Sequence, residues 1–99
     1  MTKSTFELNS FFERNNFSDM LARAGVTVEE AARLFKVSRV TIYTWRDGHA
    51  PNQQLILDRA ERIITAINKA TAAGDLPIIN LEKDAKYQKL AETLRKHLG

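Results

Sequence analysis

The stretch that decides the fold is residues 27–48, TVEEAARLFKVSRVTIYTWRDG. It begins with the pattern of a capping box, because the Thr27 hydroxyl can accept the Glu30 backbone N–H while the Glu30 carboxylate reaches back to the N–H of Thr27. Apolar residues then recur at positions i, i+3, i+4 and i+7, namely Val28, Ala31, Ala32 and Phe35. This spacing predicts a short amphipathic helix that begins after Thr27.

A second short helix is expected after a turn of about three residues. Ser38 is a good N-cap and Gly48 ends the segment, which predicts a helix from Arg39 to about Asp47. Two short helices joined by such a turn are the signature of a helix-turn-helix unit. The sequence therefore predicts that unit at roughly Thr27–Asp47.

The second helix of this unit has two different faces at about 100° per residue. Ile42 and Trp45 share the side that we expect to dock it on the protein, with Val37 of the turn beside them. The other side carries donors, an aromatic ring and a β-branched apolar group: Arg39, Tyr43 and Arg46, flanked by Val40 and Thr44. A helix divided in this way suits a major groove, which is about 12 Å wide and admits one helix.

The remaining blocks also have helical patterns. We expect helices over Thr5–Asn16, over Phe17–Ala24 up to Gly25, and over Leu55–Ala73 up to Gly74. A last helix is expected from an N-cap near Asn80, with an apolar stripe formed by Tyr87, Leu90, Ala91, Leu94 and Leu98. The fold class is therefore predicted as all-α with five or six helices. Residues 1–75 would form the helix-turn-helix domain and 76–99 a C-terminal helical element, a candidate for dimerisation.

Composition sets limits on function. The chain has 99 residues, with 15 basic and 12 acidic side chains and a net charge of +3, which is compatible with a nucleic-acid partner. It contains no cysteine, and its two histidines, His49 and His97, are far apart, so no metal site or cofactor is expected. No apolar stretch approaches the roughly 20 residues of a membrane span, and residues 1–4 lack a signal-peptide pattern. We expect a soluble, cytoplasmic protein without a nucleophile–base pair, and hence not an enzyme.

The segment Val28–Trp45, VEEAARLFKVSRVTIYTW, resembles the helix-turn-helix of the lambda repressor/Cro-type family of bacteria and phages. The matching positions are the small residue of the first helix, the apolar residue of the turn, the cap, and the two docking residues: Ala32, Val37, Ser38, Ile42 and Trp45. One position departs from the family pattern, since Lys36 stands where glycine in a left-handed conformation is usual.

The resemblance implies base contacts by Arg39, Val40 and Thr44, and phosphate contacts by Ser38, Tyr43, His49 and Asn52. Chemistry adds detail, because Arg39 can pair with guanine O6 and N7 and Val40 can meet a thymine methyl group. Tyr43 and Arg46 could reach bases or phosphates, and Lys36 could add a phosphate contact. The backbone N–H groups at Thr27 and Ser38 belong to helix N-termini, which also favour phosphate.

These features predict a sequence-specific double-stranded DNA-binding transcriptional regulator, of repressor type, bacterial or phage in origin, and acting as a homodimer through its C-terminal third. Two alternatives stay open. A phage assembly or packaging adaptor could use the same fold for oligomer contacts, and a detached piece of a recombinase is a less favoured possibility. Basic residues interleave with acids on the last helix, which favours a solvated face over a second DNA contact: Lys83, Lys86, Lys89, Arg95 and Lys96.

Overall fold

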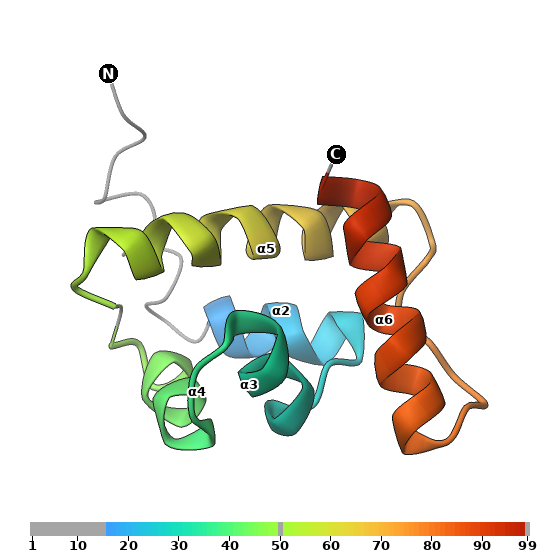
Figure 1. Cartoon of the computed structure of the whole chain (residues 1–99), viewed down its shortest axis with the longest axis horizontal. Coiled ribbons are helices and arrows are strands. Elements are labelled where there is room, and N and C mark those ends of the chain that lie inside the picture. Colours follow the sequence, from blue (N-terminus) through green and yellow to red (C-terminus); the bar gives the residue numbers. More distant parts are fainter. Residues whose placement is uncertain (1–15, 50, 99) are drawn as a thin grey trace.

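The computed structural model describes residues 16–49 and 51–98, which form five α-helices and no strand (Figure 1). In chain order the helices are α2 (Asn16–Ala24), α3 (Val28–Phe35), α4 (Arg39–Arg46), α5 (Gln54–Ala72) and α6 (Lys83–Leu98). The predicted all-α class is confirmed. The helix expected over Thr5–Asn16 lies outside the described residues, apart from Asn16, which begins α2.

The signals that begin α3 and α4 act as the sequence predicts. Thr27 Oγ1 accepts the Glu30 backbone N–H at 3.1 Å, and Glu30 Oε1 accepts that of Thr27 at 3.0 Å, so the capping box is complete. Ser38 Oγ accepts the backbone N–H of Thr41 at 3.1 Å and caps α4. Between the helices, Lys36 has φ 60° and ψ 47°, which is the left-handed conformation expected at that position of the turn.

Three aromatic rings join α2, α3 and α4 at the centre of the core. Phe17 of α2, Phe35 of α3 and Trp45 of α4 are all buried, and each ring meets the other two edge to face. Their centroids are 5.5 to 5.7 Å apart, within the range where aromatic pairs attract beyond simple area burial. The orientation of α4 is therefore fixed from its inner side by Trp45.

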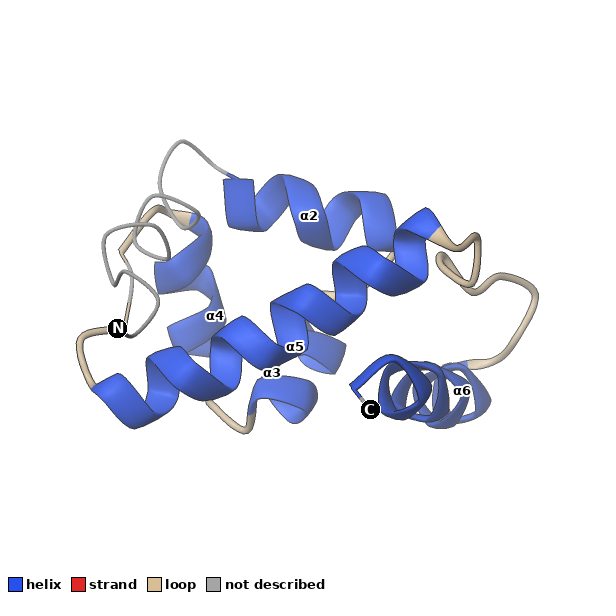
Figure 2. Cartoon of the chain, turned by 90° about the horizontal axis from the view of Figure 1, so that it is seen from above, coloured by secondary structure: helices blue, strands red, loops and turns tan. Residues whose placement is uncertain are grey.

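The long helix α5 lies across α2, α3 and α4, and α6 stands against its far end (Figure 1). Viewed from above, α6 is seen end-on while α5 runs along its length, so the two axes cross (Figure 2). The apolar stripe of α5 is buried, and Leu90 and Leu94 of α6 belong to the same core with 1% and 3% exposure. Residues 76–98 thus contribute apolar side chains to the same core as the helix-turn-helix.

The start of α6 differs from the prediction. Asn80 is not its N-cap: it has φ 67°, a left-handed conformation that asparagine tolerates, and the helix begins three residues later at Lys83. A bond from the Lys86 backbone N–H to the Glu82 carbonyl, at 2.7 Å, forms the first helical turn. None of the five described helices is both long and apolar enough to pass through a membrane.

Candidate nucleic-acid interface

Helix α4 divides into the two faces that its sequence predicts. Ile42 is fully buried and Trp45 is 3% exposed, so these two side chains attach the helix to the core. Val40 is 73% exposed and Tyr43 is 53% exposed, and Arg39 and Thr44 are exposed with them. The four residues predicted to read bases are therefore accessible and lie on one helix of eight residues.

Two of these exposed side chains have a defined local role. The Thr44 hydroxyl donates to the Val40 carbonyl at 3.0 Å, which leaves its methyl group and its oxygen lone pairs for an outside partner. Arg39 lines the same cleft as Glu29 at the N-terminus of α3; Lys83 is the main cause of the lowered pKa of the Glu29 carboxyl, and the charge of Arg39 adds a smaller effect. The guanidinium is thus close to a carboxylate without forming an ion pair within the described chain.

Arg46 differs from the other predicted contact residues of α4. It is half-buried, and its Nε donates to Ser18 Oγ of α2 at 3.3 Å. Its guanidinium carbon lies 5.8 Å from the centroid of the Tyr43 ring, within reach of a cation–π contact. The Arg46 side chain is therefore directed toward α2 and contacts the Tyr43 ring. It remains a candidate phosphate contact.

The predicted phosphate positions are distributed around α4. Ser38 exchanges a hydrogen bond with Thr41 Oγ1 at 3.0 Å in addition to its capping bond, and the Thr27 N–H is taken up by Glu30. His49 and Asn52, after α4, are both exposed. Lys36 is exposed too, but it lines a different cleft from Arg39, and the two clefts share no lining residue.

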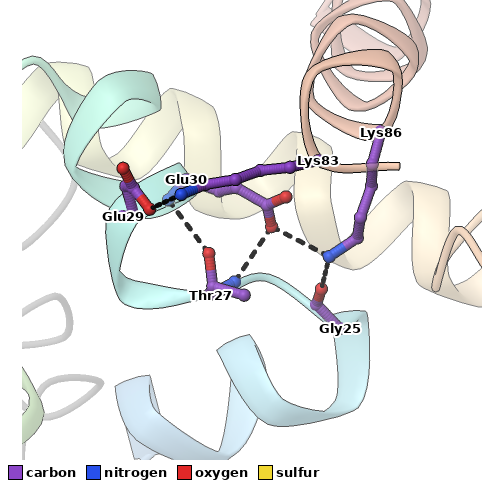
Figure 3. A network of polar contacts seen from close by, with 6 residues as sticks. All are labelled: Gly25, Thr27, Glu29, Glu30, Lys83 and Lys86. Carbon is purple, nitrogen blue, oxygen red and sulfur yellow. Dashed lines mark hydrogen bonds and ion pairs between the residues drawn. The ribbon is translucent and has the colours of Figure 1, made fainter. Parts of the chain in front are cut away.

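A cleft of about 450 Å³ brings three of the predicted residues, Thr27, Arg39 and Tyr43, together with two lysines of α6. Lys83 Nζ lies 2.7 Å from Glu29 Oε1 (Figure 3). Lys86 Nζ lies 3.0 Å from Glu30 Oε1 and donates to the Gly25 carbonyl at 2.8 Å.

The predicted solvated face of α6 is therefore wrong for Lys86, whose side chain is only 20% exposed. Lys83 is 74% exposed, but it also forms an ion pair with Glu29. Sequence reasoning missed both contacts because the partners lie more than fifty residues away and no local pattern connects them.

The charges of this cleft leave it slightly positive. A hydrogen bond from Lys83 and its positive charge hold the pKa of Glu29 below its ordinary value of 4.5, and the same contact raises the pKa of Lys83. Three cations (Arg39, Lys83 and Lys86) face two carboxylates (Glu29 and Glu30), which gives a balance of one positive charge. The cleft borders the exposed face of α4 and suits a negatively charged neighbour.

Comparison of the chain with protein-family models, with curated proteins and with solved structures finds no match. Within residues 16–49 and 51–98, no group of three or more histidine, aspartate or glutamate side chains is arranged to hold a metal ion. The interface therefore has to be interpreted from its own residues.

Proposed function

We propose that this chain is a sequence-specific double-stranded DNA-binding regulator of transcription, of the lambda repressor/Cro type, with α4 as its recognition helix. The observation that carries the proposal is the division of α4, in which Ile42 and Trp45 are buried while Arg39, Val40, Tyr43 and Thr44 face outward. A helix anchored on one side and bearing donors and methyl groups on the other has the form that the major groove accepts.

Each exposed residue of α4 then has a role. Arg39, in the first turn, offers two donors to guanine O6 and N7, and Val40 contacts a thymine methyl group. Tyr43 and Thr44 lie one turn further along and reach bases or the adjoining sugars. The phosphate contacts are assigned to residues around α4, namely Thr27, Lys36, Ser38, Arg46, His49 and Asn52. For Thr27 the contact falls to its side-chain hydroxyl, because its backbone N–H is donated to Glu30.

The regulator is proposed to act as a homodimer in the cytoplasm of a bacterium or a phage-infected cell. Helix-turn-helix dimers bind two half-sites about 34 Å apart, which requires a second copy related by two-fold symmetry. Because Leu90 and Leu94 of α6 are buried within the chain, a dimer through the C-terminal third would use its exposed apolar side chains, such as Ile79 and Leu81.

Selection from random DNA duplexes, followed by fluorescence anisotropy on the selected sequence, tests the proposal. Arg39→Ala should weaken binding by about 1–3 kcal/mol and relax the preference at one base pair. Arg95→Ala, which also removes an exposed positive charge but from the last turn of α6, is the matched control and should leave base preference unchanged. Affinity should also fall steeply as salt is added.

The opposite result has a clear form. If no sequence is enriched, and light scattering gives a closed ring of many copies, the chain is an assembly adaptor and the regulator proposal fails. If DNA is bound but Arg39→Ala and Arg95→Ala behave alike for every duplex, α4 is not the helix that reads the sequence.

A further inference from the structure

A second cleft, of about 360 Å³, lies where the C-terminal ends of α3 and α6 meet α5. We propose that this cleft binds a small organic anion that has an acidic headgroup and a short apolar body. Its lining combines three cations and three aliphatic side chains: Lys36, Arg59 and Arg62, with Leu34, Ile63 and Leu98. The two clefts share no lining residue, but Lys36 is also a phosphate contact of the proposed function, so this proposal is tested on the chain without DNA.

The cations determine the charge of the ligand. Among the described residues, no carboxylate forms an ion pair with Lys36, Arg59 or Arg62, in contrast to Lys83 and Lys86 in the other cleft. Arg59 Nη1 donates to the Phe35 carbonyl at 3.5 Å, which holds this guanidinium near the end of α3. Three cations at one cleft whose described lining holds no carboxylate favour a carboxylate or phosphate group on the ligand, which arginine binds with two parallel hydrogen bonds.

The backbone at Lys36 supports a role for its side chain. Lys36 has φ 60° and ψ 47°, a conformation that glycine adopts freely and that a residue with a Cβ adopts only at a cost. Glycine would therefore serve the turn better, so a lysine here indicates that its ammonium group has a role, either in this cleft or in the phosphate contact proposed above. Lys36 lines the cleft and is its third cation, beside Arg59 and Arg62.

The apolar residues and the volume determine the rest of the ligand. Leu34 and Ile63 are half-buried and Leu98 is 44% exposed, so together they form an aliphatic wall beside the cations. A volume of about 360 Å³ is at the lower end of the range for small-molecule sites. It suits a short aliphatic or aromatic body better than a helix, which is about 10–12 Å across with its side chains.

The experiment is an NMR titration of the ¹⁵N-labelled full chain, without DNA, with octanoate, octyl phosphate, octanol and inorganic phosphate. We expect octanoate or octyl phosphate to shift the amide signals of residues around the cleft. The ligand that binds with the higher affinity shows whether the cleft prefers a carboxylate or a phosphate headgroup. The affinity for octanol should be lower by about tenfold or more, because octanol cannot form charge-assisted hydrogen bonds. Inorganic phosphate should also bind more weakly, because it has no apolar body.

Two variants test the named residues. Lys36→Gly removes a cation at a position whose backbone suits glycine, so the fold should be kept, and Arg62→Gln removes a second one. Each should weaken octanoate or octyl phosphate binding by about two- to fivefold, the range for one exposed ionic contact. Lys89→Gln, an exposed charge of α6 outside the cleft, should have no effect.

The proposal is overturned if neither amphiphile shifts the cleft signals. It is also overturned if inorganic phosphate binds as tightly as octyl phosphate, or if all three variants bind alike.

Discussion

Lys86 Nζ of α6 lies 3.0 Å from Glu30 Oε1, so α6 forms an ion pair with the carboxylate of the capping box at the start of α3. The Glu30 side chain is 6% exposed and also accepts the Thr27 N–H, while the lysine donates to the Gly25 carbonyl. Arg33 of α3 adds a second link, since its guanidinium carbon lies 3.7 Å from the centroid of the Tyr87 ring. Helix α6 therefore helps to hold α3, on which α4 packs.

Lys86→Met should be strongly destabilising. It keeps the aliphatic length of the side chain but leaves the Glu30 carboxylate buried without its counter-charge. We expect the free energy of unfolding to fall by about 3 kcal/mol, the lower end of the range for a broken buried pair, because the lysine retains some exposure. Urea unfolding followed by circular dichroism measures the loss.

Two further variants separate charge from packing at this position. Lys83→Met breaks the exposed pair with Glu29 and should cost much less than Lys86→Met. Adding Glu30→Gln to Lys86→Met keeps a residue that can complete a capping box and removes the unpaired charge, so it should recover much of the lost stability. If the double variant is no more stable than Lys86→Met alone, the loss comes from packing instead of charge.

Gly25→Ala should cost more stability than Gly74→Ala. Both glycines have positive φ, 69° and 84°, so both substitutions carry the left-handed cost of about 1 kcal/mol. At Gly25 an added Cβ would also lie 2.6 Å from Pro77 Cβ, whereas nothing lies within 4 Å of the one at Gly74. We expect about 1–3 kcal/mol of additional loss at Gly25, from overpacking. Equal losses in urea unfolding would mean that the Pro77 segment moves aside freely.

The helix-turn-helix could be predicted from the sequence because its signals are local. The capping box, the Ser38 cap, and the spacing of Ile42 and Trp45 all act within one or two helical turns, and the structure has them as expected. The exposure of Arg39, Val40, Tyr43 and Thr44 follows from the same spacing.

The position of α6 could not be predicted, because it depends on contacts between distant residues. Lys86 and Glu30 are 56 positions apart, and nothing near either residue indicates its partner. Asn80 was misleading for a different reason, since asparagine is favoured both as an N-cap and in the left-handed conformation that it adopts here. The hydrogen bond from Arg46 to Ser18 could not be predicted either, because it depends on where α2 packs.

Acid should destabilise the fold partly through Asp75, between α5 and α6. His97 Nε2 donates to Asp75 Oδ2 at 2.9 Å and Lys96 lies 3.6 Å away, and this hydrogen bond, with the lysine charge, holds the pKa of Asp75 below its ordinary value of 3.8. Because the pKa is lower in the folded state, the stabilisation is fully present above 3.8 and is lost as the pH falls through the folded value.

Urea midpoints measured from neutral pH downward test this sign. Asp75→Asn should make the acid side of the stability profile less steep. Glu92→Gln, which removes an exposed carboxylate of α6 that forms no ion pair with another described residue, should leave its shape unchanged. Identical profiles for the wild type and Asp75→Asn would contradict the assignment.

Val40→Ala should change DNA recognition without changing the fold. Val40 is 73% exposed, so its truncation should alter the stability by no more than about 0.5 kcal/mol. On DNA, a contact between this side chain and a thymine methyl group should be worth about 0.8 kcal/mol, the value for one buried methylene-sized group. The duplex chosen by selection can be made with deoxyuridine in place of each thymidine in turn, which removes only that methyl group.

If Val40 contacts the thymine methyl group, the losses of affinity caused by Val40→Ala and by replacing that thymidine with deoxyuridine should not be additive. The wild type should lose about fourfold in affinity at one thymidine of each half-site, whereas Val40→Ala should be weaker already and lose nothing more there. At every other thymidine the two proteins should respond alike, which gives each duplex an internal control. A methyl effect of the same size in both proteins at all positions would remove Val40 from the recognition surface, and with it the proposed orientation of α4 in the groove.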